Sequence, residues 1–140
     1  MLECGSSWSY YSLWFHKKIV NARNIMVEPI SSNLEKGQLN FKLNDFTGEF
    51  LHGYIGTHYN PCSTFVDGDT MLDTRALSYN IPQFSVDWII ETHGIESLDI
   101  LHADVQHNEM PLLLGAQKSL REHKIKFIFL NIILVMQQAL

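Results

Sequence analysis

Long apolar runs and signs of secretion are both scarce in this sequence. The longest apolar stretch, residues 125–136, is interrupted by Lys126 and Asn131. It is also shorter than the roughly 20 residues that a membrane-spanning helix needs. The first five residues lack the basic segment and apolar core of a signal peptide. We therefore expect a cytoplasmic protein that does not associate with membranes.

Cysteine and positive charge are also sparse. Cys4 and Cys62 are the only cysteines and form no CxxC pair, so we expect free thiols instead of a disulfide framework. Ten Lys and Arg against 15 Asp and Glu give a net charge of −5 with no long basic run, which argues against a nucleic-acid partner. No His, Cys or carboxylate set has metal-ligand spacing, so we expect no metal.

Short apolar runs that alternate with helical segments dominate the rest of the chain. We predict strands at 1–4, 24–28, 49–56, 98–103 and 126–135, and helices at 8–19, 32–44, 85–93 and after Asn108. Ser32 and Glu35 have the spacing of a capping box for the second helix. The alternation predicts an α/β domain with a parallel sheet. Periodicity is lost between 57 and 80, which predicts a loop insertion that shapes the substrate pocket.

A turn of small residues follows the first predicted strand. Glu3 is followed by Cys-Gly-Ser-Ser-Trp-Ser, which places small residues at 5, 7 and 9, the spacing of a G-x-G-x-G loop. Small side chains let the backbone approach a ligand closely, and Gly5 is suited to a positive φ. The start of the next helix would offer free N–H groups to a polar or anionic ligand group.

Glu28 ends the second predicted strand, 23 residues after Gly5. An acidic residue at this distance and in this context is typical of a ribose-binding position. The alternative is an ordinary strand–turn–helix followed by a surface glutamate. The joint context of the two features favours nucleoside binding.

The fourth predicted strand is followed by Asp104-Val-Gln-His-Asn-Glu109. Ligands of open α/β sheets lie beyond the carboxyl ends of the strands, so we expect Asp104 and Glu109 to face the same crevice as Gly5. The alternative stays open that Asp104 only caps the next helix and that Glu109 only complements its dipole.

Residues 98–116, LDILHADVQHNEMPLLLGA, resemble the hallmark of the FkbM-type methyltransferases, a stretch like IDLLKIDVEGxExxVLxGA. Leu2-Glu-Cys-Gly5 is similar to methyltransferase motif I, and Val27-Glu-Pro29 to the VEP turn that follows it. The similarity covers roughly residues 2–56 and 82–130. Ser7 and Ser9 stand where motif I often has glycine, and His107 where the DVEG glycine stands.

This resemblance implies S-adenosylmethionine as cofactor and methyl transfer to a hydroxyl of a sugar or another small metabolite. By position, Asp104 would lie beside the transferring methyl group, and Asp104 or Glu109 would orient or deprotonate the acceptor hydroxyl. The residues that the resemblance assigns to cofactor binding are Glu3, Gly5, Ser6, Ser7, Ser9 and Glu28.

The resemblance also implies an open, Rossmann-like, mostly parallel sheet of about five strands in the order 3-2-1-4-5, with flanking helices. We expect residues 1–140 to form a single domain, truncated at both ends and lacking the family's terminal strand pair. The fifth strand would then be an exposed apolar edge through which the chain could form a homo-oligomer.

Three alternatives stay open beside an active methyltransferase. The chain could be a degenerate or truncated cofactor-binding domain without turnover. It could be a nicotinamide-dependent oxidoreductase, which Rossmann-like spacing permits but the VEP and DVQ-x-x-E stretches disfavour. It could also be a structural fragment that is stable only as an oligomer.

Overall fold

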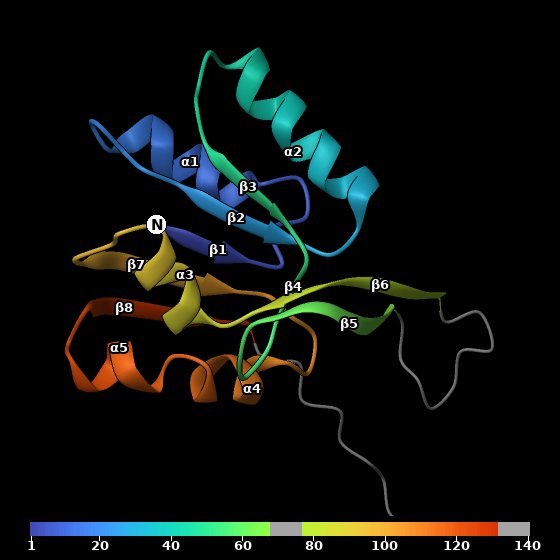
Figure 1. The fold of residues 1–140 in the computed structure, drawn as a ribbon. Helices are drawn as coiled ribbons and strands as arrows, with labels where there is room; N and C mark the ends of the chain where they lie inside the picture. Colours follow the sequence, from blue (N-terminus) through green and yellow to red (C-terminus); the bar gives the residue numbers. More distant parts are fainter. Residues whose placement is uncertain (68–76, 132–140) are drawn as a thin grey trace, which may run out of the picture.

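A computed structural model describes residues 1–67 and 77–131, and a parallel five-stranded sheet forms its centre (Figure 1). The strand order is β3-β2-β1-β7-β8, and every neighbouring pair is parallel. The strands are β1 (Leu2–Cys4), β2 (Ile25–Glu28), β3 (Glu49–His52), β7 (Leu98–Ala103) and β8 (Ile125–Leu130). The predicted α/β class and the predicted 3-2-1-4-5 order are confirmed.

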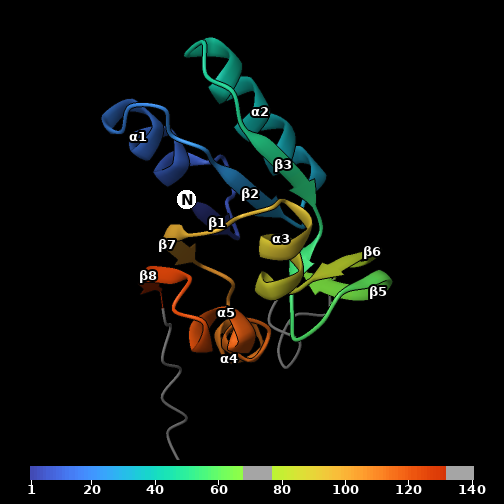
Figure 2. The ribbon, with the colours of Figure 1, turned by 60° about the vertical axis from the view of Figure 1, so that its left-hand side comes forward.

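Helices cover both faces of this sheet, as crossover connections between parallel strands require. One pair packs on the first face: α1 (Tyr10–Lys18) and α2 (Ser31–Leu43). Three short helices pack on the other face: α3 (Val86–Thr92), α4 (Glu109–Leu114) and α5 (Gln117–Arg121). Figures 1 and 2 show these two layers on either side of the strands.

The main core lies between the sheet and α3, α4 and α5. All residues of β1 and β2 are buried, as expected for the central strands of a parallel sheet. Ile89, Leu101 and Leu112 are fully buried in this cluster. The rigid centre thus fixes the carboxyl ends of β1, β2 and β7, where the candidate site lies.

Helix α1 leaves most of its large aromatic side chains exposed. Only Ser12 and Phe15 of the helix are buried, whereas Trp8 before it and Trp14 within it are exposed. The reason is a polar contact beneath the helix, because the backbone N–H of Ser12 donates to Glu3 Oε2 at 3.0 Å. This bond holds the side of the helix that carries Ser12 toward the sheet.

The predicted capping box at the start of α2 is wrong. The helix begins at Ser31 with Ile30 as its N-cap, and no side chain of that residue caps it. Glu28 Oε1 instead accepts the backbone N–H of Ile30 at 3.0 Å. The carboxylate at the tip of β2 thereby holds the residue that leads into α2.

Strands occupy most of the described part of the segment predicted as a loop. A second sheet has the order β4-β6-β5, formed by β4 (Tyr54–Ile55), β5 (Asn60–Asp67) and β6 (Leu77–Phe84). The loop prediction is therefore wrong for 60–67 and 77–80, while 68–76 lie outside the described residues. The predicted strand 49–56 is divided at Gly53, where a Cβ would lie only 2.4 Å from the carbonyl oxygen of Pro82.

Strand β8 is an edge of the five-stranded sheet within the part of the chain that the structure describes. Phe127 and Phe129 on this strand are exposed, which agrees with the predicted apolar edge. Of the predicted strand 126–135, residues 132–135 lie outside the described residues. Among the described helices, none is both long and apolar enough to cross a membrane.

Candidate active site

The turn after β1 depends on a glycine. Gly5 has a φ of +70°, a backbone conformation that side chains with a Cβ rarely adopt. A Cβ at this position would lie 2.0 Å from the carbonyl oxygen of Asp104. The Gly5 N–H also donates to the carbonyl of Val27 at 2.9 Å. Gly5 therefore brings the ends of β1, β2 and β7 together at one point.

Four residues without glycine's freedom adopt the same left-handed backbone at this end of the sheet. They are Ser7 (φ 47°), Ser9 (φ 60°), Gln106 (φ 42°) and His107 (φ 76°). Each such residue costs roughly 1–2 kcal/mol relative to ordinary backbone. Ser7, Ser9 and His107 are the three positions where the resembling motifs have glycine. The two turns thus keep a glycine-type backbone with larger side chains on it.

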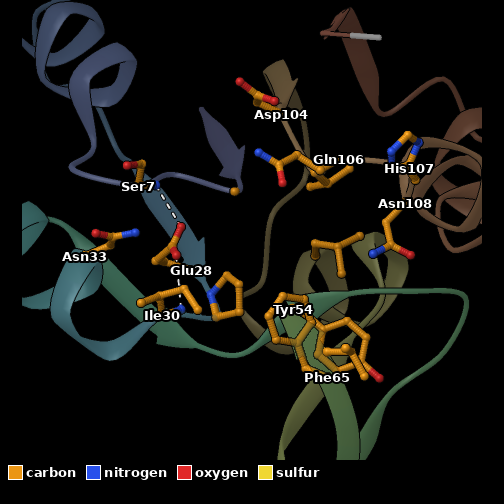
Figure 3. Close-up of a pocket in the computed structure, with 15 residues that line it drawn as sticks. Ser7, Glu28, Ile30, Asn33, Tyr54, Phe65, Asp104, Gln106, His107 and Asn108 are labelled. Carbon is orange, nitrogen blue, oxygen red and sulfur yellow. Dashed lines mark hydrogen bonds between the residues drawn. The ribbon is translucent and has the colours of Figure 1, made fainter. Parts of the chain in front are cut away.

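Glu28 joins three elements at the tip of β2. Its Oε2 accepts the backbone N–H of Ser7 at 2.8 Å, and its Oε1 accepts that of Ile30 (Figure 3). The residue is only 4% exposed, yet it lines a cleft. Two backbone N–H groups thus fix the orientation of the carboxyl group. Glu28 is therefore a fixed acceptor at the predicted ribose position.

Asp104 lies at the end of β7 and lines the same cleft. The side-chain amide of Asn131, which follows β8, donates to Asp104 Oδ2 at 3.0 Å. This bond orients the carboxylate from the neighbouring strand end. The alternative that Asp104 caps the next helix finds no support, because the N-cap of α4 is Asn108.

The cleft has a volume of about 380 Å³, within the usual range of small-molecule sites. It lies at the carboxyl ends of the strands, where open α/β sheets bind ligands.

The residues that line the cleft come from three parts of the fold. The β1 turn, the tip of β2 and the start of α2 contribute Gly5, Ser7, Glu28, Pro29, Ile30 and Asn33. The turn after β7 contributes Asp104, Val105, Gln106, His107 and Asn108. The second sheet contributes Tyr54, Ile55, Phe65 and Val66.

Negative charge dominates this cleft. Glu28 and Asp104 line it, and no lysine or arginine does so among the residues that the structure describes. A cationic group is therefore favoured inside, and an anionic group meets two carboxylates without a compensating positive side chain.

Three residues of the predicted cofactor site lie beneath the cleft and do not line it. Glu3, Ser6 and Ser9 are all buried, with Glu3 only 1% exposed. Burial raises the pKa of Glu3 to about 7, against the opposing effect of its hydrogen bond from Ser12. We predicted that the start of α1 offers free N–H groups to a ligand. This prediction is corrected, because Glu3 accepts the Ser12 N–H. A carboxylate of the protein itself occupies that helix start.

Glu109 is the first residue of α4 and is not among the residues that line the cleft. Its Oε1 is buried and has no hydrogen-bond partner among the described residues. The structure thus brings Asp104 to the crevice of Gly5 but does not bring Glu109 there.

Sequence reasoning missed the wall contributed by the second sheet. Tyr54 lies in the predicted strand 49–56 and Phe65 in the segment without clear periodicity, and both line the cleft. At 63–66 two polar residues precede two apolar ones, so no strand-type alternation marked this segment. Asn33, on the first turn of α2, was also missed.

A second cavity of about 560 Å³ lies at the opposite, amino end of the strands, lined by residues such as Met1, Ile25 and Leu98. It is larger, but ligands of open α/β sheets bind at the carboxyl ends. None of the residues predicted as a site lines it. The smaller cleft is therefore the candidate site.

Comparison with known proteins gives one family and one similar structure. The family model described as "Methyltransferase FkbM domain" matches residues 4–139. No curated protein matches the chain. A crystal structure of methyltransferase FkbM from Methylobacillus flagellatus KT is similar with a TM-score of 0.63 and 20% sequence identity. The match covers 89% of this chain and 30% of that chain, so this chain spans less than a third of that protein. At this identity the structural likeness shows the fold, whereas the family model matches nearly the whole sequence. The chain therefore belongs to the FkbM methyltransferase domain family.

Proposed function

We propose that this chain binds S-adenosylmethionine in the cleft and methylates a hydroxyl group of a small metabolite. One observation carries the proposal: Gly5 and Ser7, Glu28, and Asp104 meet at the carboxyl ends of three adjacent strands. Membership of a methyltransferase domain family supports the reaction type.

The donor groups of the cleft suit this cofactor. The Glu28 carboxylate is a fixed acceptor for the hydroxyl pair of a ribose. The negative lining suits the positive charge of a sulfonium group. Gly5 and Ser7 would lie along the cofactor, whereas Glu3, Ser6 and Ser9 would support the turn from beneath.

The bound cofactor would supply a methyl group on a positively charged sulfur. The protein's part is then mainly to position the reactants, because methyl transfer is a displacement along one line. Asp104, oriented by Asn131, would hold the acceptor hydroxyl and take its proton. We assign the general base to Asp104 and not to Glu109, since only Asp104 lines the cleft.

The geometry argues against the nicotinamide alternative. A dinucleotide places its diphosphate at the start of the helix after the first strand. Here Glu3 accepts the Ser12 N–H at that place, and the cleft itself is acidic. An additional diphosphate would face negative charge without a positive partner.

Calorimetric titration of the folded chain with S-adenosylmethionine and, separately, with NAD tests the proposal. We expect the chain to bind S-adenosylmethionine and not NAD. Glu28→Gln should weaken this binding at least about tenfold, because it removes one charge-assisted hydrogen bond. Glu35→Gln, on the exposed face of α2, is the matched control and should bind normally. Binding of neither compound would overturn the proposal.

A second step separates an active enzyme from a degenerate relative. Transfer of a labelled methyl group to a panel of hydroxyl compounds should be detectable, and Asp104→Asn should lower kcat by about 10²-fold or more. Cofactor binding without transfer to any acceptor would instead support a cofactor-binding domain without turnover.

A further inference from the structure

The wall of the cleft that β4 and β5 provide has no role in the proposed cofactor site. We infer that Tyr54 and Phe65 on this wall form a platform for the methyl acceptor, and that the acceptor is an uncharged hydroxylated ring. This inference rests on the proposed function, since it assigns the second substrate of the same cleft.

Tyr54 and Phe65 present ring surfaces to the cleft. Their ring centroids are 5.2 Å apart with an interplanar angle of 40°, and Figure 3 shows the two rings side by side at the end of the second sheet. Tyr54 Oη lies 2.7 Å from Ser63 Oγ and 3.5 Å from the carbonyl oxygen of Thr64. Because the hydroxyl is bonded within the protein, the tyrosine is held in place and offers its ring.

A third ring of the second sheet flanks the platform. Phe65 is paired with Tyr79 in the antiparallel register of β5 and β6, and their ring centroids are 6.5 Å apart. Tyr79 does not line the cleft. Phe65 is therefore the ring of this pair that a ligand in the cleft can contact, and Tyr79 is its neighbour outside the cleft.

The position of the platform separates it from the nucleoside side. In Figure 3, Tyr54 and Phe65 lie on one side of the cleft, Asp104 lies on another, and Ser7 and Glu28 lie together on a third. A cofactor on the Ser7 and Glu28 side leaves the two rings and the Asp104 carboxylate for the acceptor. This arrangement places an acceptor between an apolar wall and the proposed base.

Charge restricts the class of acceptor. The described lining contains the carboxylates of Glu28 and Asp104 and neither lysine nor arginine. A phosphate, sulfate or carboxylate group on the acceptor would lose its hydration without gaining a positive partner. An uncharged acceptor avoids this penalty.

Polar side chains form a further edge of the cleft. Gln106, His107 and Asn108 line the cleft on the turn after β7. Their amide and imidazole groups can donate to and accept from hydroxyl groups. An apolar wall beside such an edge matches a ring that has one face of C–H groups and a rim of hydroxyls.

Saturation-transfer NMR on the full chain tests this inference without depending on turnover. The probes are methyl glucoside and methyl galactoside, with the 6-phosphates of the same sugars as anionic counterparts. We expect binding of the neutral glycosides and none of the phosphates. Tyr54→Leu and Phe65→Leu, which keep an apolar side chain, should weaken glycoside binding by about fivefold to tenfold.

Two controls guard against loss of folding. Tyr54→Phe keeps the ring without the hydroxyl, and Tyr79→Leu removes the flanking ring outside the cleft. Both should retain glycoside binding within about twofold, a small change on the scale of a ring contact. Calorimetry should show an unchanged dissociation constant for S-adenosylmethionine in all four variants.

Each outcome decides between the proposals. Equal binding of neutral and phosphorylated sugars, or no binding of any sugar, would overturn the inference. A ring substitution that weakens the cofactor and not the glycoside would assign the platform to the cofactor and also overturn it. Ring-dependent glycoside binding without cofactor binding would overturn the proposed function and leave the sugar platform standing.

Discussion

Gly5 approaches the backbone of Asp104 so closely that a Cβ on Gly5 would lie 2.0 Å from the Asp104 carbonyl oxygen. This approach joins the turn after β1 to the end of β7, and so joins the proposed cofactor side of the cleft to the proposed base. Both the backbone conformation of Gly5 and the contact exclude a side chain.

Gly5→Ala should therefore lower the free energy of unfolding by several kcal/mol, on the order of 3 or more, because it adds overpacking to backbone strain. Urea unfolding followed by circular dichroism measures this. Gly94→Ala is the matched control: Gly94 has a φ of +60° but nothing lies within 4 Å of its would-be Cβ, so only about 1 kcal/mol should be lost. Equal losses at the two sites would contradict the close contact.

Ser7→Gly should stabilise the protein slightly, by about 0.5 kcal/mol. Glycine relieves the left-handed backbone of an exposed residue with φ 47°, and this gain exceeds glycine's entropic cost. Ser32→Gly, on the exposed first turn of α2, should lose about 0.5–1 kcal/mol. Equal destabilisation by Ser7→Gly and Ser32→Gly would contradict this prediction.

Glu3 should make stability depend on pH. Burial raises its pKa from 4.5 to about 7 in the folded protein, so the folded state keeps a proton that the unfolded state releases in this range. The contribution of Glu3 is therefore most favourable below about pH 4.5 and falls as the pH rises to about 7. Glu3→Gln keeps an acceptor for the Ser12 N–H and should remove this dependence.

The difference in unfolding free energy between wild type and Glu3→Gln should accordingly change by on the order of 2–3 kcal/mol between about pH 5 and pH 8, with the wild type losing stability. Exposed Glu35 supplies the control, since Glu35→Gln should show no such trend. A wild type that gains stability relative to Glu3→Gln over this interval would contradict the raised pKa.

Asn131 should act as a positioning residue through Asp104. Asn131→Asp would place a second carboxylate against Asp104 Oδ2, where the amide now donates at 3.0 Å. Like charges raise the pKa of a carboxyl group, so the acidic limb of the kcat profile should move to higher pH. Asn131→Ala should lower kcat about tenfold without that displacement. An unchanged pH profile in Asn131→Asp would exclude the coupling.

The parallel sheet and part of the site could be predicted because their signals are local. Gly5 and Asp104 each follow a short strand and Glu28 ends one, and parallel strands bring their carboxyl ends to one edge. The exposed side of α1 could not be predicted, since its orientation depends on buried Glu3, a residue type that is usually exposed.

The second sheet escaped prediction for a different reason. Pro61 lies in β5 and Pro82 in β6, and proline within a run argues against a strand in sequence reasoning. Only the three-dimensional pairing of Phe65 with Tyr79 shows that these segments are strands. The aromatic wall of the cleft depends on this pairing and so could not be found from spacing alone.

Amide NMR spectra during titration with S-adenosylmethionine test the central claim most directly, because they locate the bound cofactor on the chain. We predict shifts for the backbone amides of Gly5, Ser7 and Asn33 at the cleft, with Ser97 and Asp99 at the opposite cavity unchanged. Shifts confined to the opposite cavity, or no shifts at saturating cofactor, would contradict the account.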